Sequence, residues 1–411
     1  MQTVTNEFQA AAGKSSFIRK MFEKGLELKK EFGEDAVCDF SLGNPDVPPP
    51  EAARAVLHKI ADDAVRPLGL GYCPNAGIPE CREAIAAYLR RQQFGVEPCR
   101  GGEGEKFSGK DIILTVGAAS ALVTFFRSTL EPGDEVIVPS PYFVEYGNYC
   151  GHFGGKLKPV ETNEDFTLNL ENIKAAINER TRAIIINSPN NPTGTIYSQQ
   201  ELEALAKIVE IHNSQSTIQR PLYILSDEPY RAFAYDGAKV PPVMPMTKWA
   251  VVLGSFSKTL SMAGERIGYI GVNPELSKLD GGTLINTLTL VNRTLGYVNA
   301  PVIGQRLAAA ICNETVDLGI YKRRRDLMAD VLKDAGIEFI MPKGAFYFFP
   351  KAPGGDDMKF VDELLKEKIL AVPGSGFGRK GHVRLSCSVD EKIIERSREG
   401  FKRAVRVFRV D

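Results

Sequence analysis

Short runs of β-branched and other apolar residues alternate with stretches of helical periodicity between residues 111 and 272. The runs show no polar alternation, which is typical of parallel sheets because helices cover both faces of such a sheet. The pattern therefore predicts an α/β fold, with a mostly parallel sheet in a three-layer large domain. The runs are Asp-Ile-Ile-Leu-Thr-Val, Glu-Val-Ile-Val-Pro, Arg-Ala-Ile-Ile-Ile-Asn, Leu-Tyr-Ile-Leu-Ser and Ala-Val-Val-Leu-Gly.

The chain has 411 residues, more than one ordinary core of about 100–200 residues accommodates, so we expect a large domain and a smaller one. Helical patterns dominate from about residue 300, with strands near Phe346–Phe349 and Val383–Ser386 and a last amphipathic helix that carries Ile393 to Phe408. We predict that residues 51–299 form the large domain and 300–411 the small one. Residues 1–50 would add an N-terminal segment to the small domain.

Two local features belong to this organisation. Ser15 or Ser16 could cap an amphipathic helix that begins with Phe17. Residues 43–50, Gly-Asn-Pro-Asp-Val-Pro-Pro-Pro, cannot continue a helix or a central strand, so we expect an irregular segment that crosses between the domains.

Charge and cysteine usage exclude several function classes. The 51 basic residues balance the 51 acidic ones, so no excess charge indicates a nucleic-acid partner. No apolar run approaches the ~20 residues of a membrane span, and the N-terminus lacks a secretory pattern, so we expect a cytoplasmic protein without a membrane role. The seven cysteines are scattered without a Cys-x-x-Cys pair, and we expect no metal site.

Two glycine-rich segments imitate nucleotide-binding loops. Residues 104–110 match the first part of a P-loop, but Asp111 replaces the Ser or Thr that would bind magnesium, and the segment precedes a strand instead of following one. Gly374-Ser-Gly-Phe-Gly378 also leads into a strand, and a tight turn is the expected use of its glycines.

Polar residues follow several predicted strands directly. Asn191 lies after the Ile-Ile-Ile run, Asp227 and Tyr230 lie after Leu-Tyr-Ile-Leu-Ser, and Lys258 lies after Val-Val-Leu-Gly. Gly117 follows another strand and opens a helix, whose N-terminal amides can bind an anion. Because ligands bind at the carboxyl ends of parallel strands, these residues are expected to form one site.

With these motifs in this order, the chain resembles the class I aminotransferases of the pyridoxal-phosphate fold-type-I group, the superfamily of aspartate aminotransferase. The similarity extends from Ser41-Leu-Gly-Asn-Pro to Arg384-Leu-Ser. Residues 255–269, Ser-Phe-Ser-Lys-Thr-Leu-Ser-Met-Ala-Gly-Glu-Arg-Ile-Gly-Tyr, look like the family's cofactor-lysine signature, and Asn-Asn-Pro-Thr-Gly and Asp-Glu-Pro-Tyr accompany it.

The resemblance implies that the large domain binds pyridoxal 5′-phosphate, with Lys258 as the Schiff-base lysine and proton carrier. A lysine desolvated beside cations has a lowered pKa, which suits this role. Asp227 matches the carboxylate that keeps the pyridine nitrogen protonated, and Asn191 and Tyr230 match the groups that bind the phenolic oxygen. The phosphate would be bound by Ser255, Ser257, Arg266 and the amides of Gly117, Ala118 and Ala119.

Further roles follow from the same resemblance. Arg384 matches the arginine that binds the substrate α-carboxylate, with Gly43 and Asn191 beside that group. Tyr72 matches a tyrosine that reaches the phosphate of the neighbouring subunit, so a homodimer with shared active sites is expected. The chain departs from the family where relatives often stack tryptophan on the cofactor, because Phe143 stands there.

The expected activity is transfer of an amino group from an L-amino acid to a 2-oxo acid, as part of amino-acid metabolism or biosynthesis. Aspartate, alanine and aromatic amino acids remain open as donors, and Arg293 is a candidate for a second substrate carboxylate. One alternative is a pyridoxal-phosphate β-lyase on the same fold, which would retain Lys258, Asp227 and Arg384. Another is a non-catalytic amino-acid sensor, although the few residues before Ser15 leave no room for a helix-turn-helix domain.

Overall fold

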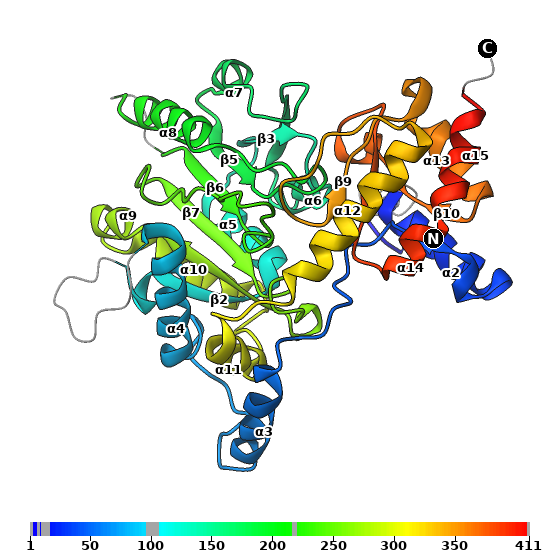
Figure 1. Ribbon diagram of the computed structural model, residues 1–411. Helices are drawn as coiled ribbons and strands as arrows, with labels where there is room; N and C mark the ends of the chain where they lie inside the picture. The colour runs from blue at the N-terminus through cyan, green and yellow to red at the C-terminus, as the bar shows by residue number, and fades with distance from the viewer. Residues whose placement is uncertain (1–2, 6–8, 10–16, 96–106, 216–219, 409–411) are drawn as a thin grey trace.

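The computed structural model describes residues 3–5, 9, 17–95, 107–215 and 220–408. A seven-stranded sheet in the order β2-β8-β7-β6-β5-β3-β4 lies in the larger part of the molecule, at the left of Figure 1. Only β8 runs antiparallel to its neighbours within this sheet, which confirms the prediction of a mostly parallel sheet. The strands are β2 (Ile112–Val116), β3 (Glu135–Ser140), β4 (Lys156–Glu161), β5 (Thr181–Asn187), β6 (Tyr223–Asp227), β7 (Ala250–Ser255) and β8 (Ile267–Val272).

Both faces of this sheet are buried. Along β5, Ile184 and Ile186 belong to one hydrophobic cluster, whereas Ala183 and Ile185 belong to another on the opposite face. This explains why the strand sequences lack polar alternation. Different helices cover the two faces. The first cluster includes residues of α3 (Ala52–Ala64), α4 (Pro79–Leu89), α7 (Leu170–Ala176), α8 (Gln199–Asn213) and α11 (Val302–Ile311). The second includes residues of α5 (Gly117–Thr129), α6 (Glu145–Gly151), α9 (Pro274–Leu279) and α10 (Thr283–Thr294).

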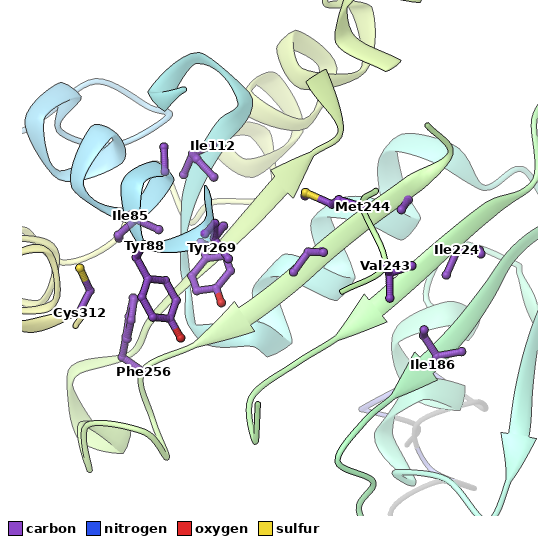
Figure 2. Close-up of a cluster of buried hydrophobic side chains, with 14 of the residues drawn as sticks. Ile85, Tyr88, Ile112, Ile186, Ile224, Val243, Met244, Phe256, Tyr269 and Cys312 are labelled. Carbon is purple, nitrogen blue, oxygen red and sulfur yellow. The ribbon is translucent and has the colours of Figure 1, made fainter. Parts of the chain in front are cut away.

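Aromatic rings fill part of the first cluster beneath β7 and β8. Figure 2 shows Tyr88, Phe256 and Tyr269 grouped together, with Ile186 and Ile224 on neighbouring strands of the same face. The Phe256 ring centroid lies 5.9 Å from that of Tyr88 and 5.7 Å from that of Tyr269. This packing anchors the start of the loop that carries Lys258.

A second core gathers residues from both ends of the chain. Cys38 and Phe40 pack there with Phe348, Phe360 and Phe401. The strands form a three-stranded antiparallel sheet and a parallel pair: β11 (Val372–Pro373), β12 (Val383–Ser386) and β9 (Tyr347–Phe348), then β1 (Cys38–Asp39) and β10 (Ile369–Leu370). The helices around them are α2 (Phe17–Phe32), α12 (Leu318–Ala335), α13 (Asp357–Lys366), α14 (Glu391–Arg396) and α15 (Arg398–Arg406).

Residues 43–50 contain no helix or strand and run from β1 toward α3, as the prolines predict (Figure 1). Ala300 and Leu307 pack in the core of the large sheet, whereas Met328 and Leu332 of α12 pack in the second core. Packing therefore changes between α11 and α12. The domain boundaries at residues 50 and 299 remain predictions.

The prediction of one continuous last helix is wrong. Ser397 separates α14 from α15, and its hydroxyl donates a hydrogen bond of 2.7 Å to the Ile394 carbonyl. A serine hydroxyl that bonds the preceding turn competes with the helical ladder, which explains the interruption. Phe408 lies beyond the end of α15.

Other expectations concern loops and the N-terminus. Gly374–Phe377 is a short 3-10 turn that ends at Gly378, whose φ of 80° favours glycine, as expected for a tight turn. Residues 107–110 of the imitation P-loop lead into β2, while residues 104–106 lie outside the described part of the chain, as do Ser15 and Ser16. Within the described ranges, no helix is long and apolar enough to cross a membrane.

Candidate active site

Most of the predicted site residues line one cavity, which lies at the carboxyl ends of three adjacent strands. β5 and β6 end in register, with Asn187 opposite Asp227, and β7 lies next to β6. The cavity at this edge has a volume of about 280 Å³. Ten predicted residues line it: Ala118, Ala119, Phe143, Asn191, Asp227, Tyr230, Ser255, Ser257, Lys258 and Arg266. The prediction that strand ends bring these side chains together is therefore met by the geometry.

Asp227 is buried at the floor of this cavity. The Tyr146 hydroxyl, from α6, donates a hydrogen bond of 2.6 Å to its Oδ2, while Oδ1 is buried without a hydrogen-bond partner among the described residues. Burial raises the pKa of Asp227 to about 7, although the Tyr146 hydrogen bond opposes this shift. An unpaired buried carboxylate oxygen is costly, so Oδ1 is suited to a positively charged donor on a ligand.

An amide fixes the backbone around Asp227. Asn187 Nδ2 donates a hydrogen bond of 2.8 Å to the Asp227 carbonyl, and Asn187 Oδ1 accepts one of 2.7 Å from the Asn191 backbone. Asn187 therefore ties the end of β6 to the turn after β5. Sequence inspection missed both Asn187 and Tyr146, because an asparagine at a strand end and a tyrosine on a helix are common structural residues.

Lys258 projects its amine into the cavity. Its Nζ donates a hydrogen bond of 2.6 Å to the Gly43 carbonyl, in the irregular crossing segment. Burial lowers the pKa of Lys258 to about 8, and the positive charges of Arg384 and Arg266 add to this effect. A substantial fraction of the amine is thus neutral near pH 8, as a nucleophile requires.

One end of the cavity forms a cradle for an anion. Gly117, with φ of 76°, begins α5 at the end of β2, and the Arg266 side chain lies so close that a Cβ on Gly117 would be 2.6 Å from Nη2. Arg266 donates a hydrogen bond of 2.9 Å from Nη1 to the Ala263 carbonyl. Gly268 brings β8 against this helix start, since a Cβ there would meet the Gly117 carbonyl carbon at 2.5 Å. Helix amides, a forked cation and the hydroxyls of Ser255 and Ser257 together suit a phosphate.

Arg384 is only 2% exposed and does not line this cavity, although it contacts Asn191, which does. Its Nη1 donates a hydrogen bond of 3.3 Å to Asn191 Oδ1, and its Nη2 donates to the Ser41 carbonyl. Its Nε has no partner among the described residues, and no carboxylate accepts the hydrogen bonds that the structure gives this guanidinium. A buried arginine without a counter-ion is costly, so Arg384 is suited to a ligand carboxylate.

The remaining predicted residues differ in their placement. Tyr230 shares a hydrogen bond of 3.0 Å with the hydroxyl of Tyr347, and Phe143 packs edge to face on Tyr146 at 5.5 Å between ring centroids. Tyr72 is 94% exposed and lies outside the residues that line the cavity. Arg293, at the end of α10, is also exposed and does not line it.

Comparison with known proteins agrees with this geometry. Residues 35–400 match the family model described as aminotransferase class I and II. The chain belongs to this family. It is 34% identical over 391 residues to the aspartate/prephenate aminotransferase of Thermus thermophilus, covering 93% of this chain and 94% of that protein. It is likewise 34% identical over 380 residues to an aspartate aminotransferase of Thermotoga maritima, covering 90% and 91% of the two chains.

Solved structures lead to the same family. An aminotransferase from Eubacterium rectale superimposes with a TM-score of 0.90 at 34% identity, covering 99% of this chain and 100% of that one. The aspartate aminotransferase of Thermus thermophilus with maleate gives 0.83 at 30% identity, with 98% and 100% coverage. The protein is thus an aminotransferase of the pyridoxal-phosphate fold-type-I group, a transferase that acts on amino and 2-oxo acids. The β-lyase alternative is not favoured.

Proposed function

We propose that this aminotransferase carries pyridoxal phosphate on Lys258 and uses L-aspartate as an amino donor to a 2-oxo acid. One observation supports the assignment of the site: the Lys258 amine, whose pKa is lowered, and an Asp227 carboxylate oxygen without a hydrogen-bond partner among the described residues line one cavity. The buried Arg384 guanidinium hydrogen-bonds Asn191, which lines the same cavity. The names of the similar proteins from Thermus and Thermotoga support aspartate as donor. Alanine and aromatic donors, and a role for Arg293, remain to be separated by experiment.

The residues present fit this cofactor. Asp227 Oδ1 offers an unsatisfied acceptor for a protonated ring nitrogen, and the cradle of Gly117, Ser255 and Arg266 offers donors for a phosphate. When bound, pyridoxal phosphate supplies an electron sink for bonds at the substrate α-carbon.

The protein's own groups would share the remaining tasks. Lys258 Nζ would hold the cofactor and, when free, would accept and return a proton at the substrate α-carbon. Asn191 and Tyr230 would donate hydrogen bonds to the phenolic oxygen. Arg384 would bind the α-carboxylate, and its burial excludes the water that would otherwise compete for the guanidinium.

We expect addition of L-aspartate to the purified holoenzyme, without an acceptor, to convert the bound cofactor to its pyridoxamine form. The change is followed by absorbance, and a 2-oxo acid should reverse it. A screen of kcat/KM for aspartate, glutamate, alanine and aromatic amino acids then ranks the donors. No conversion with any donor would contradict transamination by this chain. If Arg293→Ala abolishes a preference for dicarboxylic amino acids, Arg293 binds the second substrate carboxylate. If the preference survives in Arg293→Ala, Arg293 is a surface residue without that role.

We also propose a homodimer with shared active sites. Several apolar side chains between the end of α3 and Tyr72 are exposed on the single chain, among them Val65 at 87% and Leu68 at 88%. Tyr72 itself has no place in its own chain's cavity, which supports a role at the phosphate of a neighbouring subunit. An apolar surface of this kind favours association with a second copy. A cytoplasmic location remains a prediction from the sequence.

Mixing two defective variants tests the shared site. Tyr72→Ala and Lys258→Ala homodimers should each lose activity, but a heterodimer of the two would contain one site with Lys258 and the partner's intact tyrosine. We therefore expect activity to reappear after unfolding and refolding the two variants together, with sedimentation equilibrium confirming the dimer. Activity no higher than that of the separately refolded variants would argue against a shared site.

A further inference from the structure

The guanidinium of Arg384 lies between two aromatic rings. Its central carbon is 4.9 Å from the ring centroid of Tyr347 and 4.8 Å from that of Phe377. The two rings come from different elements: Tyr347 lies in β9, and Phe377 lies in the glycine-rich turn before β12. Arg384 itself lies in β12. All three side chains are buried. The turn that imitated a nucleotide loop thus brings an aromatic ring onto a buried cation.

This arrangement compensates for part of the cost of burying Arg384. The faces of the two rings attract the cation, and because they occupy space beside it they restrict its rotation. The guanidinium retains in-plane hydrogen bonds to Asn191 and to the Ser41 carbonyl, while Nε has no partner. Donors that lie in a fixed plane match the forked geometry of a carboxylate better than donors that rotate.

Tyr347 also contacts the groups around Lys258. Its hydroxyl lies 3.0 Å from that of Tyr230, and it packs so closely on Gly43 that a Cβ there would be 1.9 Å from the hydroxyl oxygen. The Gly43 carbonyl accepts the hydrogen bond from Lys258. One buried side chain therefore touches the carboxylate-binding cation, the Tyr230 hydroxyl and the backbone that binds the reactive amine.

The turn that carries Phe377 is tied to the large sheet. The Phe377 carbonyl accepts a hydrogen bond of 3.1 Å from the Tyr142 backbone, and the Ser140 hydroxyl donates one of 2.9 Å to the Gly378 carbonyl. Ser140 ends β3, so the ring that covers Arg384 is positioned relative to the same sheet edge that carries Asp227.

We propose that Tyr347 and Phe377 form an aromatic clamp that positions Arg384 for the substrate α-carboxylate, and that the Tyr347 hydroxyl positions Tyr230. This inference rests on the proposed role of Arg384. Both aromatic residues are positioning residues, acting through Arg384 and Tyr230. The clamp therefore sets affinity for the carboxylate, whereas the hydroxyl affects the electronic state of the bound cofactor through Tyr230.

Four variants of the holoenzyme separate these roles. Tyr347→Leu and Phe377→Leu each remove one ring of the clamp, Tyr347→Phe removes only the hydroxyl, and Phe348→Leu is the matched control. Phe348 is a buried ring of the same strand that packs in the second core with Phe339. The readouts are the dissociation constants of propionate and succinate, which carry a carboxylate but no amine, together with KM, kcat and the cofactor dissociation constant.

We expect Tyr347→Leu and Phe377→Leu to raise KM and the dissociation constants of both carboxylates by about 2- to 30-fold, the range between exposed and desolvated cation–π contacts. Affinity for the cofactor should not change in Phe377→Leu, and Phe348→Leu should leave carboxylate binding intact. Tyr347→Phe should preserve carboxylate binding but move the pH midpoint of the bound cofactor's absorbance upward. A weaker Tyr230 donor would leave more negative charge on the phenolic oxygen, which then holds a nearby proton more tightly.

An Arg384→Ala variant separates failure of the clamp from failure of the proposed function. If Arg384→Ala binds propionate as tightly as the natural protein, Arg384 does not bind the carboxylate and the proposed function fails at this residue. If Arg384→Ala loses binding while both leucine variants retain it, the role of Arg384 stands and the clamp is overturned. An unshifted absorbance midpoint in Tyr347→Phe would overturn the positioning of Tyr230 alone.

Discussion

A Lys258→Ala variant is expected to lower kcat by at least about 10²- to 10⁴-fold, the usual contribution of a positioned acid–base group. The loss should exceed that range to the extent that the covalent attachment of the cofactor also matters. Lys258 lines the cavity with a lowered pKa, to which the positive charge of Arg266 contributes. Single-turnover kinetics with aspartate, started from cofactor-loaded variant, measures the proton-transfer step directly.

Covalent trapping tests the same residue without turnover. Borohydride reduction of the natural holoenzyme should fix the cofactor on the peptide that contains Lys258, and mass spectrometry should find no such adduct in Lys258→Ala. Adduct formation on another lysine of the natural protein would contradict the assignment. Lys248, half-buried beside Trp249 and outside the residues that line the cavity, offers a matched control, because Lys248→Ala should change neither readout.

The pH dependence has a definite sign. The buried amine has a pKa of about 8, below its ordinary value of 10.5, so it is mostly protonated below pH 8 and mostly neutral above it. Because only the neutral amine reacts, the rate at which the apoprotein captures pyridoxal phosphate should rise with pH and level off above about 8. A rate that continues to rise toward pH 10 would mean that the cavity leaves the Lys258 pKa unshifted.

The sequence was sufficient for features that depend on local pattern and on the order of strands. Unbroken apolar runs such as Ile184–Ile186 predicted a sheet covered on both faces, and the hydrophobic clusters on either side of β5 confirm it. Parallel strands present their carboxyl ends at one edge, so the sequence alone predicted that Asn191, Asp227 and Lys258 lie close together.

Residues that enter the site from elsewhere could not be found in this way. Tyr146 reaches Asp227 from 81 positions earlier, and Tyr347 reaches Tyr230 from 117 positions later. Their contacts arise from the packing of α6 and β9 onto the sheet edge, which no local periodicity encodes. The interruption at Ser397 was missed for the opposite reason: its flanking residues retain helical periodicity, and a single side-chain hydrogen bond decides the break.

The second large effect concerns Asp227. Replacing Asp227 with asparagine retains the shape of the side chain but removes the negative charge that would pair with a protonated ring nitrogen. Loss of a buried ion pair costs about 3–5 kcal/mol, so we expect kcat to fall on the order of 10²- to 10⁴-fold. Steady-state kinetics with aspartate, together with the absorbance of the bound cofactor, measures the effect. Asp227→Glu, which retains the charge, is the matched control and should retain more activity than the asparagine variant.

The same substitution should stabilise the protein when the cofactor is absent. Burial raises the Asp227 pKa to about 7 from its ordinary 3.8, so the folded state binds a proton more readily than the unfolded chain. The free energy of unfolding of the apoprotein therefore falls as the pH rises from about 4 to 7, and the full penalty, on the order of 2–4 kcal/mol, is present above pH 7. Asp227→Asn cannot ionise and should escape this penalty.

Urea denaturation of the two apoproteins at pH 5 and pH 8 measures this difference. We expect the asparagine variant to gain stability over the natural apoprotein mainly at pH 8, and to lose that advantage when pyridoxal phosphate is added, because only Asp227 can pair with the ring nitrogen. Tyr146→Phe should act in the opposite direction on the apoprotein at pH 8, since it removes the hydrogen bond that stabilises the buried carboxylate. Equal stability of natural and Asp227→Asn apoproteins at both pH values would mean that the carboxylate is already paired, and that its unpaired oxygen does not await a cationic ligand.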